Sequence, residues 1–174
     1  IGFSGDAILA LFPDDDGRTA ARAAAAMQAA MEPFSDVAVD GLPGERVHLS
    51  LRVAVTAGPV SRCVVGDPDI QLIDLVGGRT VARLERLNSA ANKGEVAVGP
   101  DVLRTLGPRV RAERRVIEDG TDVFSLMLPL PDADLRVSRP KGPSTQLDTE
   151  RLAPWLLPTV RRRLVEGQGE FLTE

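Results

Sequence analysis

The stretch IGFSGDAILALF, residues 1–12, is the part of the sequence from which the fold is best read. Two short apolar runs flank Gly5 and Asp6, and such a small, polar tip is typical of a tight reversal between antiparallel strands. The stretch therefore predicts a β-hairpin. Asp6 at its turn has two interpretations. A carboxylate at a strand end suits a hard cation such as Mg²⁺, and an Asp in a turn also commonly accepts hydrogen bonds from nearby backbone N–H groups.

Outward from this hairpin, the hydrophobic pattern predicts alternating helices and strands. Asp16 is the candidate N-cap of the first helix. Hairpins that alternate with packed helices indicate an α/β (α+β) fold, a mostly antiparallel sheet with helices on one side. Helices are expected over residues 18–32, 79–91, 100–106 and 152–165, and strands over residues 46–57, 60–65, 70–76, 95–98, 110–117 and 123–128.

A proline-rich stretch from Pro129 to Pro143 is typical of a linker. We therefore expect one domain over residues 1–129, followed by a linker and a helix over residues 130–174 that lead to a second domain. Trp155 is the expected anchor by which that helix docks on a neighbour. The sequence does not begin with Met and starts inside a predicted strand, so we expect it to be part of a longer protein.

The composition, with 43% hydrophobic and 26% charged residues, is that of an ordinary soluble globular protein. A formal net charge of -4 gives no basic field for nucleic acid or anionic lipid. No apolar run reaches the roughly 18 residues that a membrane span needs. The single cysteine, Cys63, excludes an internal disulfide and fits a reducing compartment, most simply the cytoplasm. We expect Cys63 to be a small core hydrophobe.

Four segments of the chain resemble class III nucleotidyl cyclases, in the same order. The resemblance is strongest to the first half of the soluble, bicarbonate-responsive adenylyl cyclase type and its bacterial tandem relatives. It implies a ferredoxin-like βαββαβ cyclase homology domain, whose N-terminal strand and helices would precede this sequence. The segments are FSGDAILALF (3–12), LRVAVTAGPVSRCVVGD (51–67), DLVGGRTVARLERLNSAANKGEVAVGPDVL (74–103) and LPTVRRRLVEGQGEFLTE (157–174).

The resemblance implies an active site shared by two such domains, which converts ATP to cyclic AMP and pyrophosphate with Mg²⁺ or Mn²⁺. Asp6, which follows Gly5 in the hairpin, matches a metal-binding Asp of the family. This chain therefore resembles the metal-bearing half, and its partner is a second cyclase homology domain, in tandem or as a dimer. On the substrate side, Leu75 takes the place of the base-reading residue, with Asp74 one residue away. Arg86 matches the family's phosphate-binding Arg and is the candidate catalytic residue.

Two further substrate-side positions depart from the family pattern. Gly2 stands where the family has a Lys, and Ala82 where it has an Asn. The resemblance therefore implies a degenerate second site, and bicarbonate sensing, which uses that Lys, becomes doubtful. We expect the isolated chain to be inactive.

One alternative function is a non-catalytic module that uses the same fold to dimerise or to bind a nucleotide. Under that reading Arg86 is an ordinary solvated charge on a helix face. The related palm-like fold of diguanylate cyclases is a weaker alternative, because its Gly-Gly-acid-acid hairpin is not present in this sequence.

Overall fold

The computed structural model describes residues 2–4, 7–39, 41, 44–131 and 149–167. The chain forms two compact units. Unit 1 comprises residues 1–59 and 78–136, and unit 2 comprises residues 60–77 and 137–174. Gly5, Asp6 and most of the predicted proline-rich linker lie outside the described residues.

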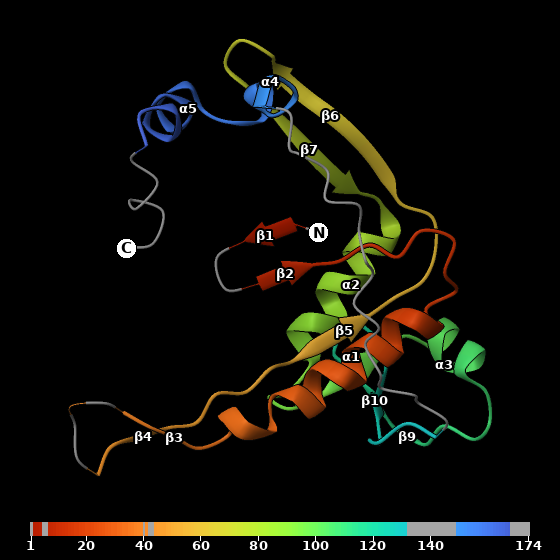
Figure 1. The fold of residues 1–174 in the computed structure, drawn as a ribbon. Coiled ribbons are helices and arrows are strands. Elements are labelled where there is room, and N and C mark those ends of the chain that lie inside the picture. Colours follow the sequence, from red (N-terminus) through yellow and green to blue (C-terminus); the bar gives the residue numbers. More distant parts are fainter. Residues whose placement is uncertain (1, 5–6, 40, 42–43, 132–148, 168–174) are drawn as a thin grey trace. The chain divides into compact units, whose positions relative to one another are not determined.

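Unit 1 is built on a four-stranded sheet in the order β5-β8-β10-β9. Strands β5 and β8 are parallel, and the other two pairings are antiparallel. This mixed α/β architecture confirms the predicted fold class. The elements of unit 1, drawn in Figure 1, are β1 (Gly2–Ser4), β2 (Ala7–Leu9), α1 (Arg18–Ala30), the 3₁₀ turn η1 (Glu32–Phe34), β3 (Val37–Ala38), β4 (Arg46–Val47), β5 (Val53–Val55), α2 (Arg79–Ala90), β8 (Val96–Val98), α3 (Pro100–Leu106), β9 (Ala112–Val116) and β10 (Asp122–Leu126).

Helices cover both faces of this sheet, which corrects the expectation that they lie on one side. Val55, Val96 and Val98 pack with the buried alanines of α1 and with Val102 of α3. Ala97 and Val123 point to the other face and pack with Leu87 and Ala91, on and just after α2. The reason is visible in the strand sequences. Val-Ala-Val in β5 and again in β8 is apolar at every position, as expected of strands buried on both faces.

The alanine-rich helix α1 lies close to the sheet because its buried side chains are only methyl groups. Ala21 is fully buried, and Ala24 and Ala25 are nearly so. Gln28 of α1 donates its side-chain N–H groups to the carbonyl oxygens of Leu51 and Glu95, at 2.8 and 3.1 Å. These bonds fix α1 beside the points where β5 and β8 begin.

Asp15, and not the predicted Asp16, caps the first turn of α1. The Asp15 carboxylate accepts hydrogen bonds from the backbone N–H groups of Gly17, Thr19 and Ala20 at 3.1 to 3.2 Å. Burial alone would raise the pKa of Asp15, but these hydrogen bonds outweigh it and hold the pKa below its ordinary value. The capping carboxylate lies one residue earlier than predicted because Gly17 adopts a left-handed conformation that turns the chain back over Asp15.

Replacing Asp15 with Ala is therefore expected to lower the free energy of unfolding by about 1 kcal/mol, the usual effect of losing a helix cap. Asp16→Ala is the matched control, since Asp16 receives a single hydrogen bond of 3.3 Å from the Arg18 N–H. Urea unfolding of the two variants measures the difference. Equal stability of both would contradict the assignment of the cap to Asp15.

The predicted strand over residues 46–57 is two separate strands. Arg46 and Val47 pair with β3 in a small hairpin, whereas Val53–Val55 pairs with β8 in the main sheet. Arg46 is held in the small hairpin by an ion pair to Asp36, with a 2.6 Å distance from Nε to Oδ1. Val47 and Leu49 are exposed rather than half-buried. Polar and apolar residues alternate across the break, so the pattern alone does not reveal it.

Unit 2 consists of a two-stranded ribbon and the C-terminal helices. The ribbon pairs β6 (Ser61–Asp67) with β7 (Gln71–Gly77), and the helices are α4 (Thr149–Leu152), the 3₁₀ turn η2 (Ala153–Trp155) and α5 (Pro158–Val165). The predicted single helix over residues 152–165 is divided because Pro154 and Pro158 have no N–H to continue it. Cys63 is exposed on β6, which corrects the expectation of a core position.

Candidate functional site

The hairpin that carries Asp6 forms as predicted. Strands β1 and β2 are antiparallel, and the pairs Gly2 with Leu9, Phe3 with Ile8 and Ser4 with Ala7 define the register. Among the described residues this hairpin pairs with no further strand. Ile8 is 56% exposed, so one apolar side chain of the hairpin is open to solvent.

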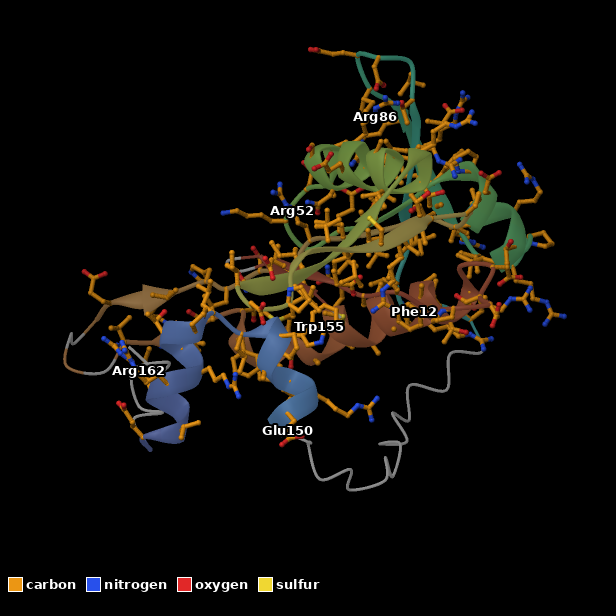
Figure 2. The ribbon with its side chains drawn as sticks, turned by 90° about the horizontal axis from the view of Figure 1, so that it is seen from above. Phe12, Arg52, Arg86, Glu150, Trp155 and Arg162 are labelled. Carbon is orange, nitrogen blue, oxygen red and sulfur yellow. The ribbon has the colours of Figure 1, made fainter. Side chains whose placement is uncertain are left out.

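Arg86, the candidate catalytic residue, lies on the exposed face of α2. Leu87 faces the core at 2% exposure, whereas Ala82 and Arg86, four residues apart, are both exposed. Positions four apart share a helix face, so this face is the one that the resemblance assigns to substrate. Figure 2 shows the labelled Arg86 side chain on the outer side of α2.

The Arg86 guanidinium is paired within its own unit. Its Nε lies 3.6 Å from Oδ2 of Asp119, in the loop between β9 and β10. Asp119 also accepts a hydrogen bond of 2.9 Å from the Thr121 N–H. The hydrogen bonds from Thr121, and to a smaller extent the charge of Arg86, hold the pKa of Asp119 below its ordinary value. Arg86 therefore has an anionic partner, Asp119, on the surface of unit 1.

Leu75 and Asp74 lie on β7 of unit 2. Leu75 is the pairing partner of Cys63 and is 47% exposed. Asp74 receives hydrogen bonds from Nε and Nη2 of Arg62, at 2.6 to 3.0 Å. This contact, mainly through its hydrogen bonds, holds the pKa of Asp74 below its ordinary value. Asp74 is therefore engaged by a cross-strand arginine. Leu75 belongs to unit 2, whereas Arg86 belongs to unit 1.

Arg83 is a residue whose role the sequence did not reveal. Its side chain links α2 to α3 and to the loop that follows β5, all within unit 1. Its Nη1 donates to Asp101 and its Nη2 to the carbonyl oxygen of Ala57, both at 3.1 Å. Arg83 also lines a cavity of about 30 Å³ together with Thr56 and Thr121. That volume is about the size of one water molecule.

The expected metal ligand of this chain is Asp6, at the turn of the first hairpin. Among the residues outside the gaps in the described chain, no group of three or more His, Cys, Asp or Glu side chains is arranged to hold a metal ion. Asp6 is the one residue that the resemblance assigns to the metal, and it lies outside that part of the chain. In the part of the chain that the structure describes, no helix is long and apolar enough to cross a membrane.

Comparison with known proteins gives similarities among solved structures only, since no family model and no curated protein matches the chain. One similar structure is the guanylyl cyclase domain of the RhoGC fusion protein from Blastocladiella emersonii, with a TM-score of 0.49 and 20% identity over 68% of this chain and 64% of that one. Another is the adenylyl cyclase CyaB from P. aeruginosa, with a TM-score of 0.44 and 14% identity over 64% and 60% of the two chains.

A third similar structure is the guanylate cyclase domain of RhGC from Catenaria anguillulae in complex with GTP. Its TM-score is 0.37, with 17% identity over 42% of each chain. This chain thus spans 42% to 64% of the lengths of these three structures. All three TM-scores are below 0.5, so the function proposed below rests on the sequence motifs of this chain and their resemblance to a family, and not on these structures.

Proposed function

We propose that this chain is the metal-bearing half of a class III nucleotidyl cyclase, which converts ATP to cyclic AMP and pyrophosphate at an interface with a second cyclase homology domain. The observation that carries the proposal is the register of β1 and β2. Ser4 pairs with Ala7, so Gly5 and Asp6 are the two residues that join the strands. They occupy the same place in FSGDAILALF as in the family hairpin that it resembles.

In this proposal, Asp6 ligates Mg²⁺ or Mn²⁺, and its charge offsets that of the cation. A bound divalent cation supplies charge neutralisation on the attacking and leaving oxygens of a phosphoryl group. Gly5 allows the backbone to approach the nucleotide closely, because it has no side chain. The partner domain supplies the groups that recognise the base and the ribose. The single cysteine favours a cytoplasmic setting.

The resemblance assigns four positions of this chain, residues 2, 75, 82 and 86, to the substrate side of the second site of such an assembly. Arg86 would contribute a cation there, but Ala82 and Leu75 end in apolar groups, and Gly2 has no side chain. Arg86 is also already paired with Asp119. We therefore propose that this second site does not catalyse.

The second candidate function is a regulatory or dimerisation module without catalysis. The loss of polar groups on the substrate side favours this function, since Arg86 is the one polar side chain among residues 2, 75, 82 and 86. The two functions differ in one measurement. Formation of cyclic AMP from ATP by the full-length protein supports the cyclase, whereas no turnover by the folded protein supports the regulatory module.

Replacing Arg86 with Ala is expected to change ATP turnover by less than about threefold, because the second site, to which Arg86 belongs, lacks its other polar groups. Loss of the exposed ion pair to Asp119 should also have little effect on stability. The measurement is the steady-state rate of cyclic AMP formation by the full-length variant. Glu85→Ala, the neighbouring exposed position on α2, is the control. A loss of activity specific to Arg86→Ala would show that its site is catalytic.

A further inference from the structure

Unit 2 contains a hollow of about 380 Å³ at the tip of the β6–β7 ribbon. One wall is the turn between the two strands, and the other is formed by η2 and α5. Small-molecule sites in proteins typically have volumes of about 300 to 1,000 Å³. The hollow therefore has the size of a small ligand site, and no part of the proposed cyclase function uses it.

Both walls are held by local structure. In the ribbon turn, Asp67 accepts the N–H of Ile70 through its carbonyl oxygen at 3.0 Å and the N–H of Asp69 through its carboxylate at 2.9 Å. Pro68, between them, favours this turn because its φ is already fixed. On the other wall, Pro158 occupies the first position of α5, where a missing N–H has no cost. The hollow is thus shaped by backbone hydrogen bonds and prolines.

Large apolar side chains in the hollow are open to solvent. Ile70 is 61% exposed and Val165 is 74% exposed, and Leu156 lies in the lining with them. Covering apolar surface is favourable by about 25 cal/mol per Å². A ligand with an apolar body would therefore gain affinity by covering Ile70 and Val165.

The charged residues of the hollow define the polar part of such a ligand. Arg161 and Arg162 form no ion pair with any other described residue. A guanidinium recognises a carboxylate, sulfonate or phosphate group through paired N–H donors. Asp69 and Glu166 also line the hollow, and their carboxylates can only accept hydrogen bonds when ionised. An acid that also carries an N–H or O–H donor satisfies both kinds of group.

We propose that this hollow binds a small amphipathic organic acid. Its acidic group lies against Arg161 and Arg162, its apolar body covers Ile70 and Val165, and its hydrogen-bond donor faces the carboxylates. Figure 2 shows the labelled Arg162 on α5. The site lies within unit 2 and needs neither a metal nor ATP turnover.

Fluorescence titration of the whole chain with 8-anilinonaphthalene-1-sulfonate tests this site, because the probe has aromatic rings, one sulfonate and one N–H donor. Saturable binding of one probe per chain is expected. The double variant R161Q/R162Q is expected to bind about tenfold more weakly, a loss equivalent to about one charge-assisted hydrogen bond. The single variant Ile70→Ser is expected to weaken binding by a similar factor through the loss of apolar contact.

Two further variants control for folding and for nonspecific attraction. R161K/R162K retains the charge and is expected to recover most of the affinity. Arg111→Gln removes an exposed arginine of unit 1 and is expected to bind the probe like the original chain. Binding without saturation, or equal affinity in R161Q/R162Q and in the original chain, would overturn the proposal.

Discussion

Replacing Asp6 with Asn is expected to lower metal-dependent formation of cyclic AMP by the full-length protein at least about 100-fold. An Asn side chain keeps the size of Asp6 but loses the negative charge of the carboxylate, the group through which proteins usually bind Mg²⁺. Substitution of the residues that hydrogen-bond to metal ligands already lowers metal affinity or activity about 10- to 100-fold. Loss of a ligand itself should lower activity by no less. The measurement is the rate of cyclic AMP formation with saturating Mg²⁺ or Mn²⁺.

Asp14→Asn is the matched control for this substitution. Asp14 lies in the loop after the hairpin, its side chain is exposed, and its positive φ of 57° is one that Asn also tolerates. This variant should keep full activity. Circular dichroism should show both variants folded, because the change at position 6 preserves shape. Activity retained by folded Asp6→Asn would remove Asp6 from the metal site.

The second large effect is expected at Glu95, a buried carboxylate of unit 1. Glu95 is 8% exposed. Its Oε1 lies 2.6 Å from Nη1 of Arg115, and its Oε2 accepts the backbone N–H of Asn92 at 2.7 Å. Replacing Glu95 with Ala leaves the Asn92 N–H without this acceptor and removes the ion pair of Arg115, which keeps its 2.6 Å hydrogen bond to the carbonyl oxygen of Ala90. The free energy of unfolding should fall by about 3 kcal/mol, at the low end for a broken buried pair, because the Arg115 side chain is 31% exposed.

Urea unfolding measures this loss, with Glu113→Ala as the control. Glu113 lies on β9 with an exposed side chain, so its removal should change the free energy of unfolding by no more than about 0.5 kcal/mol. Equal stability of the two variants would show that the Glu95 to Arg115 pair does not stabilise unit 1.

The pH dependence of unfolding tests the same pair. Burial alone would raise the pKa of Glu95, but the hydrogen bonds from Arg115 and from the Asn92 N–H, with the charge of Arg115, lower it below the ordinary value of 4.5. A carboxyl group whose pKa is lower in the folded than in the unfolded state stabilises the fold at a pH above its unfolded-state pKa. This contribution is lost as the pH falls through the folded-state pKa. The stability difference between the original chain and Glu95→Ala should therefore shrink below about pH 4.5.

The elements with strong local signals were predicted well. The first hairpin has a small, polar turn between apolar runs, and α2 follows Gly77 and Gly78 with a clear apolar stripe. The strand at Val96–Val98 and the helix that begins at Pro100 lie within one residue of the predicted bounds. Each of these features depends on neighbouring residues, so the sequence alone contains the necessary information.

The features that the sequence did not reveal depend on contacts between distant residues. The break between β4 and β5 follows from two different pairing partners, β3 and β8, which a continuous alternating pattern cannot separate. The role of Arg83 requires Asp101 and Ala57 to lie beside α2. Similarly, the pairing of Arg86 with Asp119 joins a helix to a distant turn. The assignment of Asp6 to a metal came from resemblance, because a Gly-Asp turn by itself also fits a purely structural role.

The most direct test of the proposed function is the conversion of ATP to cyclic AMP and pyrophosphate by the full-length protein, with Mg²⁺ or Mn²⁺ and again with a chelator. The proposal predicts turnover that requires the metal, yields the two products in equal amounts, and is absent in the chelated sample. No cyclic AMP from folded protein, in the presence of either metal, would contradict the cyclase assignment and support a regulatory module.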